Sequence, residues 1–526
     1  MSINRGKLLL WFRAGVAAHL GYFYFTVQFR SLEILILTGI LILAALLPAY
    51  LWCAGKAHGL PIVPVFSLSA FPTYILPIHG GSKVLEQYSQ ETEVKALLCL
   101  IGYLLILTAV WHQMCNNPRG APPTCRMLNL HSSTGILVTF LVLGALFQLA
   151  GVIFYQFSGG LFTLVRGYTA SGAMLAVFVF AYRLGLGTLS PGLKILLFMV
   201  VGLLIVTEAA TFILAGALVR LAVIGAGYTL GSQKIPWKAG LAVVGILTVL
   251  HAGKGEMRET YWKDGQGTQK FGVFDYPGIF MEWFGTGVKT LATGKTNDDE
   301  EVHSAAERGA MIGVLFRIID WTPSRKPFLQ GETYKGIPTL LIPRVLYKDK
   351  GIAHMGNWIL AYQYEFLTME ELGKTSVGFD LLSEAYANYG YLGIGFLAVF
   401  LALFYGMVGR LSVGVPLLSV RFLFAVLVLS GTLSSNNTLG VFVTTLWQSS
   451  MALLTVAFIL TKKCPNPLFV KSGGGLQGGG LGKEVVDPSS LQISQPRDER
   501  RRVEKDASFP KHERPTRFVY GKTQNK

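Results

Sequence analysis

Between residues 31 and 55 the chain reads Ser31-Leu-Glu-Ile-Leu-Ile-Leu-Thr-Gly-Ile-Leu-Ile-Leu-Ala-Ala-Leu-Leu-Pro-Ala-Tyr-Leu-Trp-Cys-Ala-Gly55, and Glu33 is the only charged residue in this stretch. An α-helix needs about 20 apolar residues to cross a hydrocarbon core of roughly 30 Å. Comparable apolar blocks recur at 93–111, 132–155, 237–250, 390–409 and 438–460. Only 14% of the 526 residues are charged, whereas soluble proteins carry about a quarter. The sequence therefore predicts an all-α polytopic membrane protein.

The hydropathy pattern predicts about twelve transmembrane helices, at residues 7–27, 31–54, 60–78, 93–113, 131–155, 167–186, 192–210, 212–231, 236–252, 390–411, 416–434 and 440–461. Four prolines interrupt the third, so it is expected to be broken or re-entrant. The first is expected to be a retained span, because no cleavage site of small residues follows it. The domain plan is then nine helices in 1–252, an extracytoplasmic loop with amphipathic helices at 253–389, three helices in 390–461 and a disordered basic cytoplasmic tail at 462–526.

The basic residues orient this scheme, because short cytoplasmic connections are enriched in lysine and arginine. One side of the predicted bundle would carry the basic tail together with Arg5, Lys7, Lys56, Arg119, Arg126, Arg183, Lys194, Lys234, Lys238 and Arg410. The short connections of the other side mainly offer Arg30, Lys83 and Arg166. Both termini are therefore expected in the cytoplasm, and the long loop outside.

The chain shows no motif for a metal, a nucleotide or nucleic acid. Its five cysteines have no metal-ligand spacing and are expected to be free thiols. Asp298-Asp-Glu-Glu301, followed by His303 and Glu307, is expected to be a solvated acidic turn, because consecutive carboxylates tend to point apart. The run Gly473–Gly482 lacks the first glycine and the final hydroxyl residue of a phosphate loop. No metal or other cofactor is predicted, and the tail is expected to contact anionic lipid or a protein partner rather than nucleic acid.

The predicted loop is too long to be a simple connection, and loops of this length usually carry function. Its first part, 254–301, is predicted to be irregular. Apolar residues at helical spacing then predict an amphipathic helix over 305–320, near the membrane surface. Downstream, aromatic residues alternate with the cations Arg325, Lys326, Lys335, Arg344, Lys348 and Lys350. These residues either bind phosphate and sugar groups or form an ordinary interfacial belt with positive surface charge.

Three stretches of this loop carry a family resemblance. They are Trp321-Thr-Pro-Ser-Arg-Lys-Pro-Phe-Leu-Gln-Gly-Glu-Thr-Tyr334, Leu341-Ile-Pro-Arg344 with Tyr347-Lys-Asp-Lys350, and Ser383-Glu-Ala-Tyr-Ala-Asn-Tyr-Gly-Tyr-Leu-Gly393. Over about 305–411 the chain resembles the bacterial O-antigen and exopolysaccharide repeat-unit polymerases. It departs from their pattern at Ser383, where glycine is common, and at Gly351, where proline often follows the lysine. Before residue 305 the resemblance is only architectural.

This resemblance implies a fold of the GT-C glycosyltransferase type in a bacterial inner membrane. It also implies that a glycan chain is transferred from polyprenyl pyrophosphate onto a lipid-linked repeat unit. The implied partners are these lipid-linked donor and acceptor glycans, the membrane and a chain-length regulator. No metal or cofactor is implied, because the lipid pyrophosphate is itself the leaving group.

The reaction needs a base for the acceptor hydroxyl and cations for the leaving pyrophosphate. The catalytic candidates are Glu384, Arg344 and Arg220, with Asp320 and His354 as reserve bases. The substrate-binding candidates are Arg317, Lys326, Tyr334, Lys350, His354, Asn357, Tyr386 and Asn388.

Two of these candidates have alternative interpretations. Glu384 is equally well explained as a carboxylate stabilised by a helix N-terminus. The family often has an arginine inside a Gly-Ser-Arg-Gly stretch, but here only Arg220 itself matches. Arg220 could also reach toward the membrane surface, or be neutralised by Glu208.

Three other functions share part of this pattern. A ligase would move finished glycan from the same lipid carrier to another acceptor. A transporter would carry polar groups along many helices and show internal repeats, which the sequence lacks. A non-catalytic subunit of a polysaccharide export assembly would use the basic tail for docking.

Overall fold

The computed structural model describes residues 5–26, 31–79, 83–117, 120–153, 160–210, 212, 214–261, 275–293, 311–342, 346–347, 350–372, 377–432 and 437–469. The chain divides into two units, Met1–Val470 and Lys471–Lys526. The second unit lies outside the described residues, as do Asp298–Glu301 and the start of the predicted helix at 305–320. The disordered tail and the solvated acidic turn therefore stay predictions.

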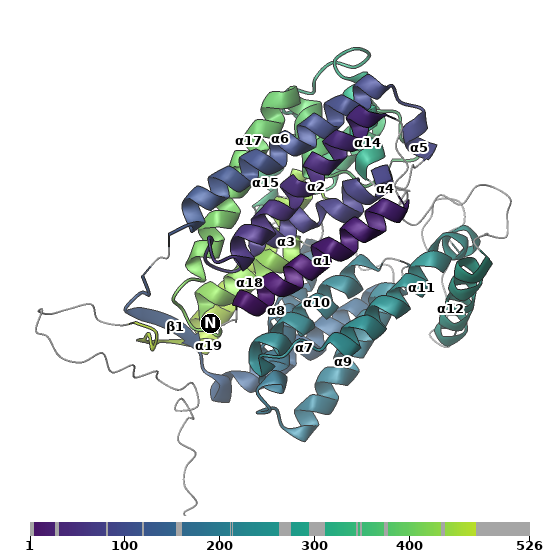
Figure 1. Ribbon diagram of the computed structural model, residues 1–526. Helices are drawn as coiled ribbons and strands as arrows, with labels where there is room; N and C mark the ends of the chain where they lie inside the picture. Colours follow the sequence, from purple (N-terminus) through teal and green to yellow (C-terminus); the bar gives the residue numbers. More distant parts are fainter. Residues whose placement is uncertain are drawn as a thin grey trace, which may run out of the picture. The chain divides into compact units, whose positions relative to one another are not determined.

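The described part of the first unit is almost entirely helical (Figure 1). Its N-terminal half contains α1 (Arg5–Thr26), α2 (Leu32–Cys53), α3 (Ile62–Leu68), η1 (Phe71–Ile75), α4 (Leu76–His79), α5 (Lys83–Glu86), α6 (Gln90–Cys115), α7 (Leu130–Ile153), α8 (Gly160–Gly185), α9 (Pro191–Ala209), α10 (Ala215–Ser232) and α11 (Trp237–Tyr261). Its C-terminal half contains α12 (Tyr276–Thr293), α14 (Met311–Trp321), η3 (Glu332–Tyr334), α15 (Ile337–Leu340), α16 (Met355–Gln363), α17 (Leu381–Leu411), α18 (Val420–Thr432) and α19 (Leu439–Leu460). Two short strands, β1 (Thr124–Leu128) and β2 (Thr461–Pro465), complete it.

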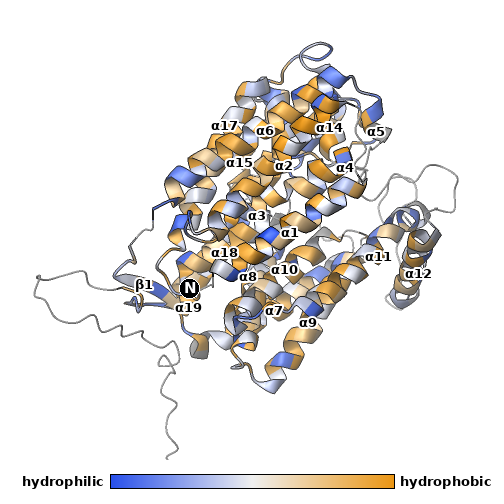
Figure 2. Ribbon diagram, viewed as in Figure 1, coloured by the Kyte–Doolittle hydropathy of each residue, from blue (hydrophilic) through white to orange (hydrophobic). Residues whose placement is uncertain are grey.

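Eight of the described helices are long and apolar enough to cross a membrane, and Figure 2 shows how strongly apolar residues dominate the bundle. They are Leu32–Cys53, Ile62–His79, Gln90–Cys115, Ser133–Gly151, Val165–Gly185, Pro191–Ala209, Leu381–Leu411 and Leu439–Leu460. The expected all-α, multi-pass architecture is confirmed. α10 and α18 are apolar but shorter, and α1 and α11 do not reach this apolar length. The total of twelve spans therefore remains a prediction.

The third predicted helix is one helical run whose middle is wound differently. Its 18 residues, Ile62–His79, pass through α3, the π-helical turn η1 and α4. Pro72 lies in the first turn of η1, and because it has no N–H it cannot donate a hydrogen bond to the preceding turn. π-turns inside α-helices are frequent at functional sites. The predicted interruption is thus a change of helical winding within a continuous span.

α6 is the central helix of this bundle, packed against both α17 and α2 (Figure 1). Leu97, Leu100, Leu104 and Leu107 follow one another at three- and four-residue intervals, and all are buried. α14 also packs on α6 and α17. An amphipathic helix is therefore present from Met311 to Trp321 with its apolar face buried, and its position near the membrane surface stays a prediction.

Within 254–301, which was predicted to be irregular, the described residues 254–261 and 276–293 are helical, which corrects the prediction for those residues. α11 continues to Tyr261, nine residues past the expected end of that helix at 252, and α12 packs against it. A side-chain carbon on Gly253 would lie 2.7 Å from the backbone nitrogen of Gly287. In the sequence such glycines suggest a loop. In the structure they have no side chain to keep α11 and α12 apart, and the two helices approach closely.

The two strands join segments that are remote in the sequence. They pair antiparallel, with Cys125 opposite Cys464, and so tie the connection after α6 to the end of α19. All five cysteines are free thiols, as expected. No strand was predicted from the sequence.

We expect mild oxidation to join Cys125 and Cys464 in a disulfide. Directly opposed residues of an antiparallel pair have Cα atoms about 4.5–5.5 Å apart, and disulfides accept this separation. Burial raises the pKa of the Cys125 thiol, so the reaction, which uses the thiolate, should accelerate as the pH rises. Copper–phenanthroline oxidation followed by peptide mass spectrometry would detect the product, and Cys464→Ser is the control. A disulfide from Cys125 to any other cysteine would contradict the strand register.

Candidate functional site

Glu384 lies in the first turns of α17 and is completely buried. The helix begins there because the Asp380 side chain accepts a hydrogen bond from the Ser383 backbone N–H at 2.6 Å, which is a normal N-cap. Glu384 Oε2 accepts a hydrogen bond of 2.6 Å from the Leu439 backbone N–H. Its other oxygen, Oε1, has no hydrogen-bond partner among the described residues. A buried oxygen without a donor requires an explanation.

The position of Glu384 is fixed by the beginning of α19. Thr438 precedes that helix, but its hydroxyl donates to the Asn357 side chain at 2.6 Å and does not cap the helix. The carboxylate of Glu384 supplies the missing acceptor from another helix and lies at the positive end of the α19 dipole. The second interpretation of Glu384, stabilisation by a helix N-terminus, is therefore correct for Oε2, although the helix is α19 and not α17.

Asn388 joins the loop before η3 to α17, and its side chain is fully used in doing so. Its Oδ1 accepts from the Gly331 N–H at 2.9 Å. Its Nδ2 donates to the Thr333 hydroxyl at 2.9 Å and to the Glu384 carbonyl at 2.8 Å. Asn388 is completely buried. It positions the loop beside Glu384 and has no remaining group for a substrate.

The loop held by Asn388 brings two more residues next to the Glu384 carboxyl group. The Thr333 hydroxyl lies beside it, and Tyr334 is close enough for the Glu384 charge to act on its phenol. Burial, together with this neighbouring carboxylate, raises the pKa of Tyr334. The Tyr334 ring lies 6.4 Å from that of Tyr389, whose exposed fraction is 48%. These contacts lead from the buried carboxyl group to the surface of the protein.

Gly356 also lies next to the Glu384 carboxyl group. A side-chain carbon at this position would lie 3.1 Å from Oε1 of Glu384. The adjacent Asn357 donates to the Val377 carbonyl at 3.2 Å and accepts from Thr438. The structure thus brings three predicted site residues, Tyr334, Asn357 and Asn388, together around the carboxyl group of a fourth, Glu384.

Arg317 and Lys326 belong to a different cluster, centred on Trp321. The Arg317 guanidinium lies 4.6 Å from the Trp321 ring and 4.5 Å from that of Phe366, and so contacts two aromatic rings. Lys326 pairs with Glu365 at 2.9 Å. It borders an open groove of about 510 Å³ whose other charged lining residues are Glu365 and Glu371. This groove lacks the surplus of positive charge that a pyrophosphate needs.

The reserve base Asp320 lies at the edge of the same cluster. It accepts a hydrogen bond of 3.1 Å from the Thr92 hydroxyl, and Arg325 lies 3.7 Å away. These contacts keep Asp320 away from the carboxyl group of Glu384. It therefore holds α14 against the start of α6.

Of the remaining candidates in the loop, Lys350 bonds to the protein backbone and His354 is exposed at the surface. Lys350 donates at 2.7 Å to the carbonyls of Leu340 and Ile342, and so closes the segment that contains Arg344. Arg344 itself lies outside the described residues. His354 is exposed at the N-terminus of α16.

Tyr386 points away from Glu384 although it is only two residues later in the helix. It is buried, and its ring lies 6.3 Å from that of Phe328 and 5.5 Å from that of Tyr391. The Tyr386 side chain therefore packs in the interior of the protein and does not belong to the group of residues around Glu384.

Arg220 forms a third cluster, in the interface of α7, α9 and α10. Its Nε donates to Glu208 at 2.8 Å, and its guanidinium also donates to the Gln148 side chain at 2.8 Å. The exposed fractions of the Arg220 and Glu208 side chains are 8% and 20%. The expected alternative, in which Glu208 neutralises Arg220, is the arrangement that the structure shows. The sequence did not single out Gln148.

Sequence reasoning also missed Asp380, which is buried and accepts a hydrogen bond of 2.7 Å from the Tyr74 hydroxyl. A signal was present, because aspartate directly before an apolar helical stretch predicts an N-cap. Nothing in the sequence indicated Tyr74, which lies 306 residues away on η1.

Gly390 separates the part of α17 that carries Glu384 from the rest of the helix. Its φ of 60° and ψ of −140° are not helical, and a side-chain carbon there would meet the Phe328 ring at 3.1 Å. We expect Gly390→Ala to destabilise the protein by about 1–3 kcal/mol, because other residues are strained in this conformation. Thermal unfolding of the detergent-purified protein measures this. Gly395→Ala is the matched control, since nothing lies within 4 Å of that position; equal losses in both variants would contradict the role of Gly390.

The described residues contain no group of three or more histidine, cysteine, aspartate or glutamate side chains arranged to hold a metal ion. The chemistry of the Glu384 site is that of one buried carboxyl group with an open acceptor position, surrounded by hydroxyl and amide groups. Neither family models nor curated proteins nor solved structures show a match to this chain.

Proposed function

We propose that this chain is a membrane glycosyltransferase that polymerises polyprenyl-pyrophosphate-linked oligosaccharide repeat units. The observation that supports this most directly is the open acceptor position on the buried Glu384 carboxyl group. This residue stands in the stretch 383–393, which most resembles the repeat-unit polymerases. The loop residues Thr333 and Tyr334 surround the same group. The proposed location is the bacterial plasma membrane, with both termini in the cytoplasm and the site at the outer leaflet.

In the proposed reaction Glu384 Oε1 takes the proton of an acceptor sugar hydroxyl. The hydroxyl oxygen then forms a bond to the anomeric carbon of the donor glycan. The bond from that carbon to the pyrophosphate oxygen breaks, and the lipid pyrophosphate leaves with the electron pair. Cations stabilise this leaving group; Arg344 is the proposed cation, because the charges of Arg220 and Lys326 are already paired with carboxylates.

Reconstitution tests the proposal directly. Purified protein in liposomes, supplied only with lipid-linked repeat units, should elongate them without a nucleotide sugar. No elongation by a folded protein would favour a non-catalytic subunit of an export assembly. Such a subunit, like the proposed enzyme, could bind a chain-length regulator.

Deletion in cells separates the polymerase from a ligase, which would share this site. Loss of a polymerase leaves single repeats on the surface acceptor. Loss of a ligase leaves long polymer that is not attached to it. Accumulation of unattached polymer would therefore replace the proposed function by ligation.

A further inference from the structure

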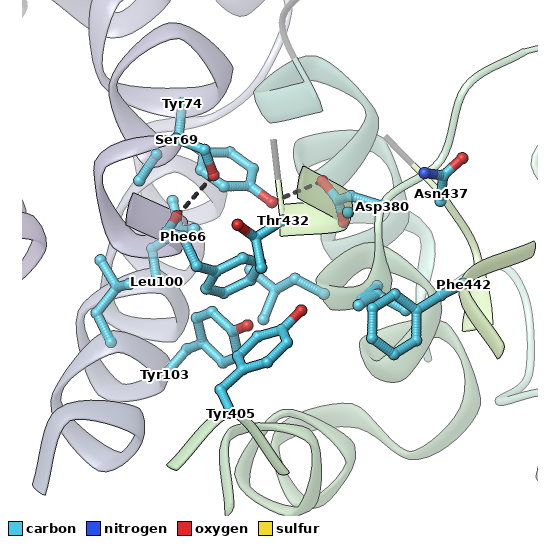
Figure 3. Close-up of a pocket in the computed structure, with 15 residues that line it drawn as sticks. Phe66, Ser69, Tyr74, Leu100, Tyr103, Asp380, Tyr405, Thr432, Asn437 and Phe442 are labelled. Carbon is cyan, nitrogen blue, oxygen red and sulfur yellow. Dashed lines mark hydrogen bonds between the residues drawn. The ribbon is translucent and has the colours of Figure 1, made fainter. Parts of the chain in front are cut away.

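A small cavity lies between α6, the π-turn η1 and the start of α17 (Figure 3). Its volume is about 40 Å³. The Asp380 carboxyl group borders it, together with the side chains of Tyr74, Tyr103, Tyr405 and Thr432. A water molecule needs about 10–15 Å³ of such space. The cavity therefore has room for a few water molecules.

Two tyrosine hydroxyl groups that face this cavity have no hydrogen-bond partner among the described residues. Tyr103 and Tyr405 are 5% and 1% exposed, and Figure 3 shows their oxygen atoms on the cavity side of the rings. Neither donates a hydrogen bond to another described residue, whereas Thr432 donates to the Leu429 carbonyl at 2.7 Å. Buried hydroxyl groups are almost always hydrogen-bonded, and ordered water supplies the partner where the protein does not.

The Asp380 carboxyl group is buried in the same place without a compensating charge. It is 2% exposed and accepts hydrogen bonds from the Tyr74 hydroxyl and the Ser383 N–H. No lysine, arginine or histidine pairs with it among the described residues. The nearest charged group is Glu384, one helical turn later, which has the same sign. Burial without a counter-charge favours the protonated form of a carboxyl group, and the hydrogen bonds from Ser383 and Tyr74 oppose this effect.

We propose that Asp380 carries a proton at neutral pH and that the cavity beside it holds ordered water, which bonds this acid to Tyr103 and Tyr405. The site is thus a built-in binding site for a proton and a small water cluster. Burial raises the pKa of Asp380, more than the hydrogen bonds from Ser383, Tyr74 and Leu382 lower it. The titratable groups that face it are Tyr74 on η1, Tyr103 on α6, and Glu384 and Tyr405 on α17.

A neutral Asp380 has a consequence for Glu384, and this consequence rests on the proposed function. Two ionised carboxylates one turn apart in the interior would repel each other. When Asp380 holds its proton, Glu384 can ionise without that repulsion and act as a base. Asp380 is then a positioning residue that sets the charge state of its neighbour and does not touch the substrate.

Infrared spectroscopy of the purified protein tests the proton site without any activity assay. A protonated carboxyl group has a C=O band that shifts in heavy water. We expect such a band at pH 7 in the wild-type protein and in Glu384→Gln, and its loss in Asp380→Asn. Asparagine caps helices as well as aspartate does, so this variant should fold.

Tyr74→Phe provides a second measurement should Asp380→Asn fail to fold. It removes the hydrogen bond of 2.7 Å to Asp380 and should shift the same band without abolishing it. A band that neither variant alters would overturn the proposal. So would the absence of the band together with stabilisation by sodium ions, which would assign an ionised Asp380 and a bound cation. Inactive protein that shows the expected band would reject only the proposed function.

Discussion

Glu384→Gln should reduce polymer synthesis at least about 100-fold, the lower end of what a positioned general base contributes. The variant should fold normally, because the glutamine amide oxygen can still accept the hydrogen bond of 2.6 Å from the Leu439 N–H. Glutamine also fills the same volume at this completely buried position. Only the ability of Oε1 to take a proton is lost. Glycan chain length in a complemented deletion strain, with protein level measured in parallel, gives the result.

Comparing Glu384→Gln with Glu384→Ala separates the two roles considered for Glu384, which are a general base and a cap of α19. If it only caps α19, Glu384→Gln makes normal polymer, while Glu384→Ala loses about 0.5–2 kcal/mol of stability, as other caps do. Glu91→Gln is the matched control, since that carboxylate is exposed and pairs with Lys95 on the surface of α6. A loss of polymer in the control would show that the assay responds to expression rather than to the base.

The fold could be predicted as far as it depends on local apolar composition. Twenty apolar residues in a membrane can satisfy their backbone hydrogen bonds alone only as a helix, so the spans from Leu32 to Ala209 and from Leu381 to Leu460 follow from the sequence. Close contacts between helices or strands do not follow from the sequence. Gly253 looks like a loop residue until Gly287 is seen to pack against it. Likewise, β1 and β2 exist only because residues more than 300 positions apart meet.

The candidate site was predictable only in part, because Tyr334, Glu384 and Asn388 lie together while other predicted residues lie in separate clusters. The motif that contains Glu384 and Asn388, and the segment before Tyr334, do converge on one place. The sequence could not show which of the cations are free to bind a substrate, because this depends on partners from other parts of the chain. Arg317 contacts two aromatic rings, and Lys326 is paired with Glu365. Trp321 lies four residues after Arg317 on the same helix, but Phe366 and Glu365 come from another segment of the chain.

Arg220→Met should destabilise the protein by about 3–5 kcal/mol, the usual cost of leaving one half of a buried ion pair. Glu208 would then remain in the interface of three helices without the guanidinium that now donates to it. Adding Glu208→Gln removes that charge, and we expect the double variant to recover most of the stability. Unfolding temperature in detergent measures both steps. Lys95→Met is the control, because its pair with Glu91 is on the surface and contributes little.

The same double variant decides whether Arg220 takes part in the reaction. Its guanidinium is already bonded to Glu208 and Gln148, which explains why a charge is tolerated there. We therefore expect the stable double variant to make polymer of normal length. A double variant that is stable but makes no polymer would assign Arg220 a direct role beside Glu384. An unfolding temperature of Arg220→Met equal to that of the wild type would instead show that the ion pair does not hold α9 and α10 together.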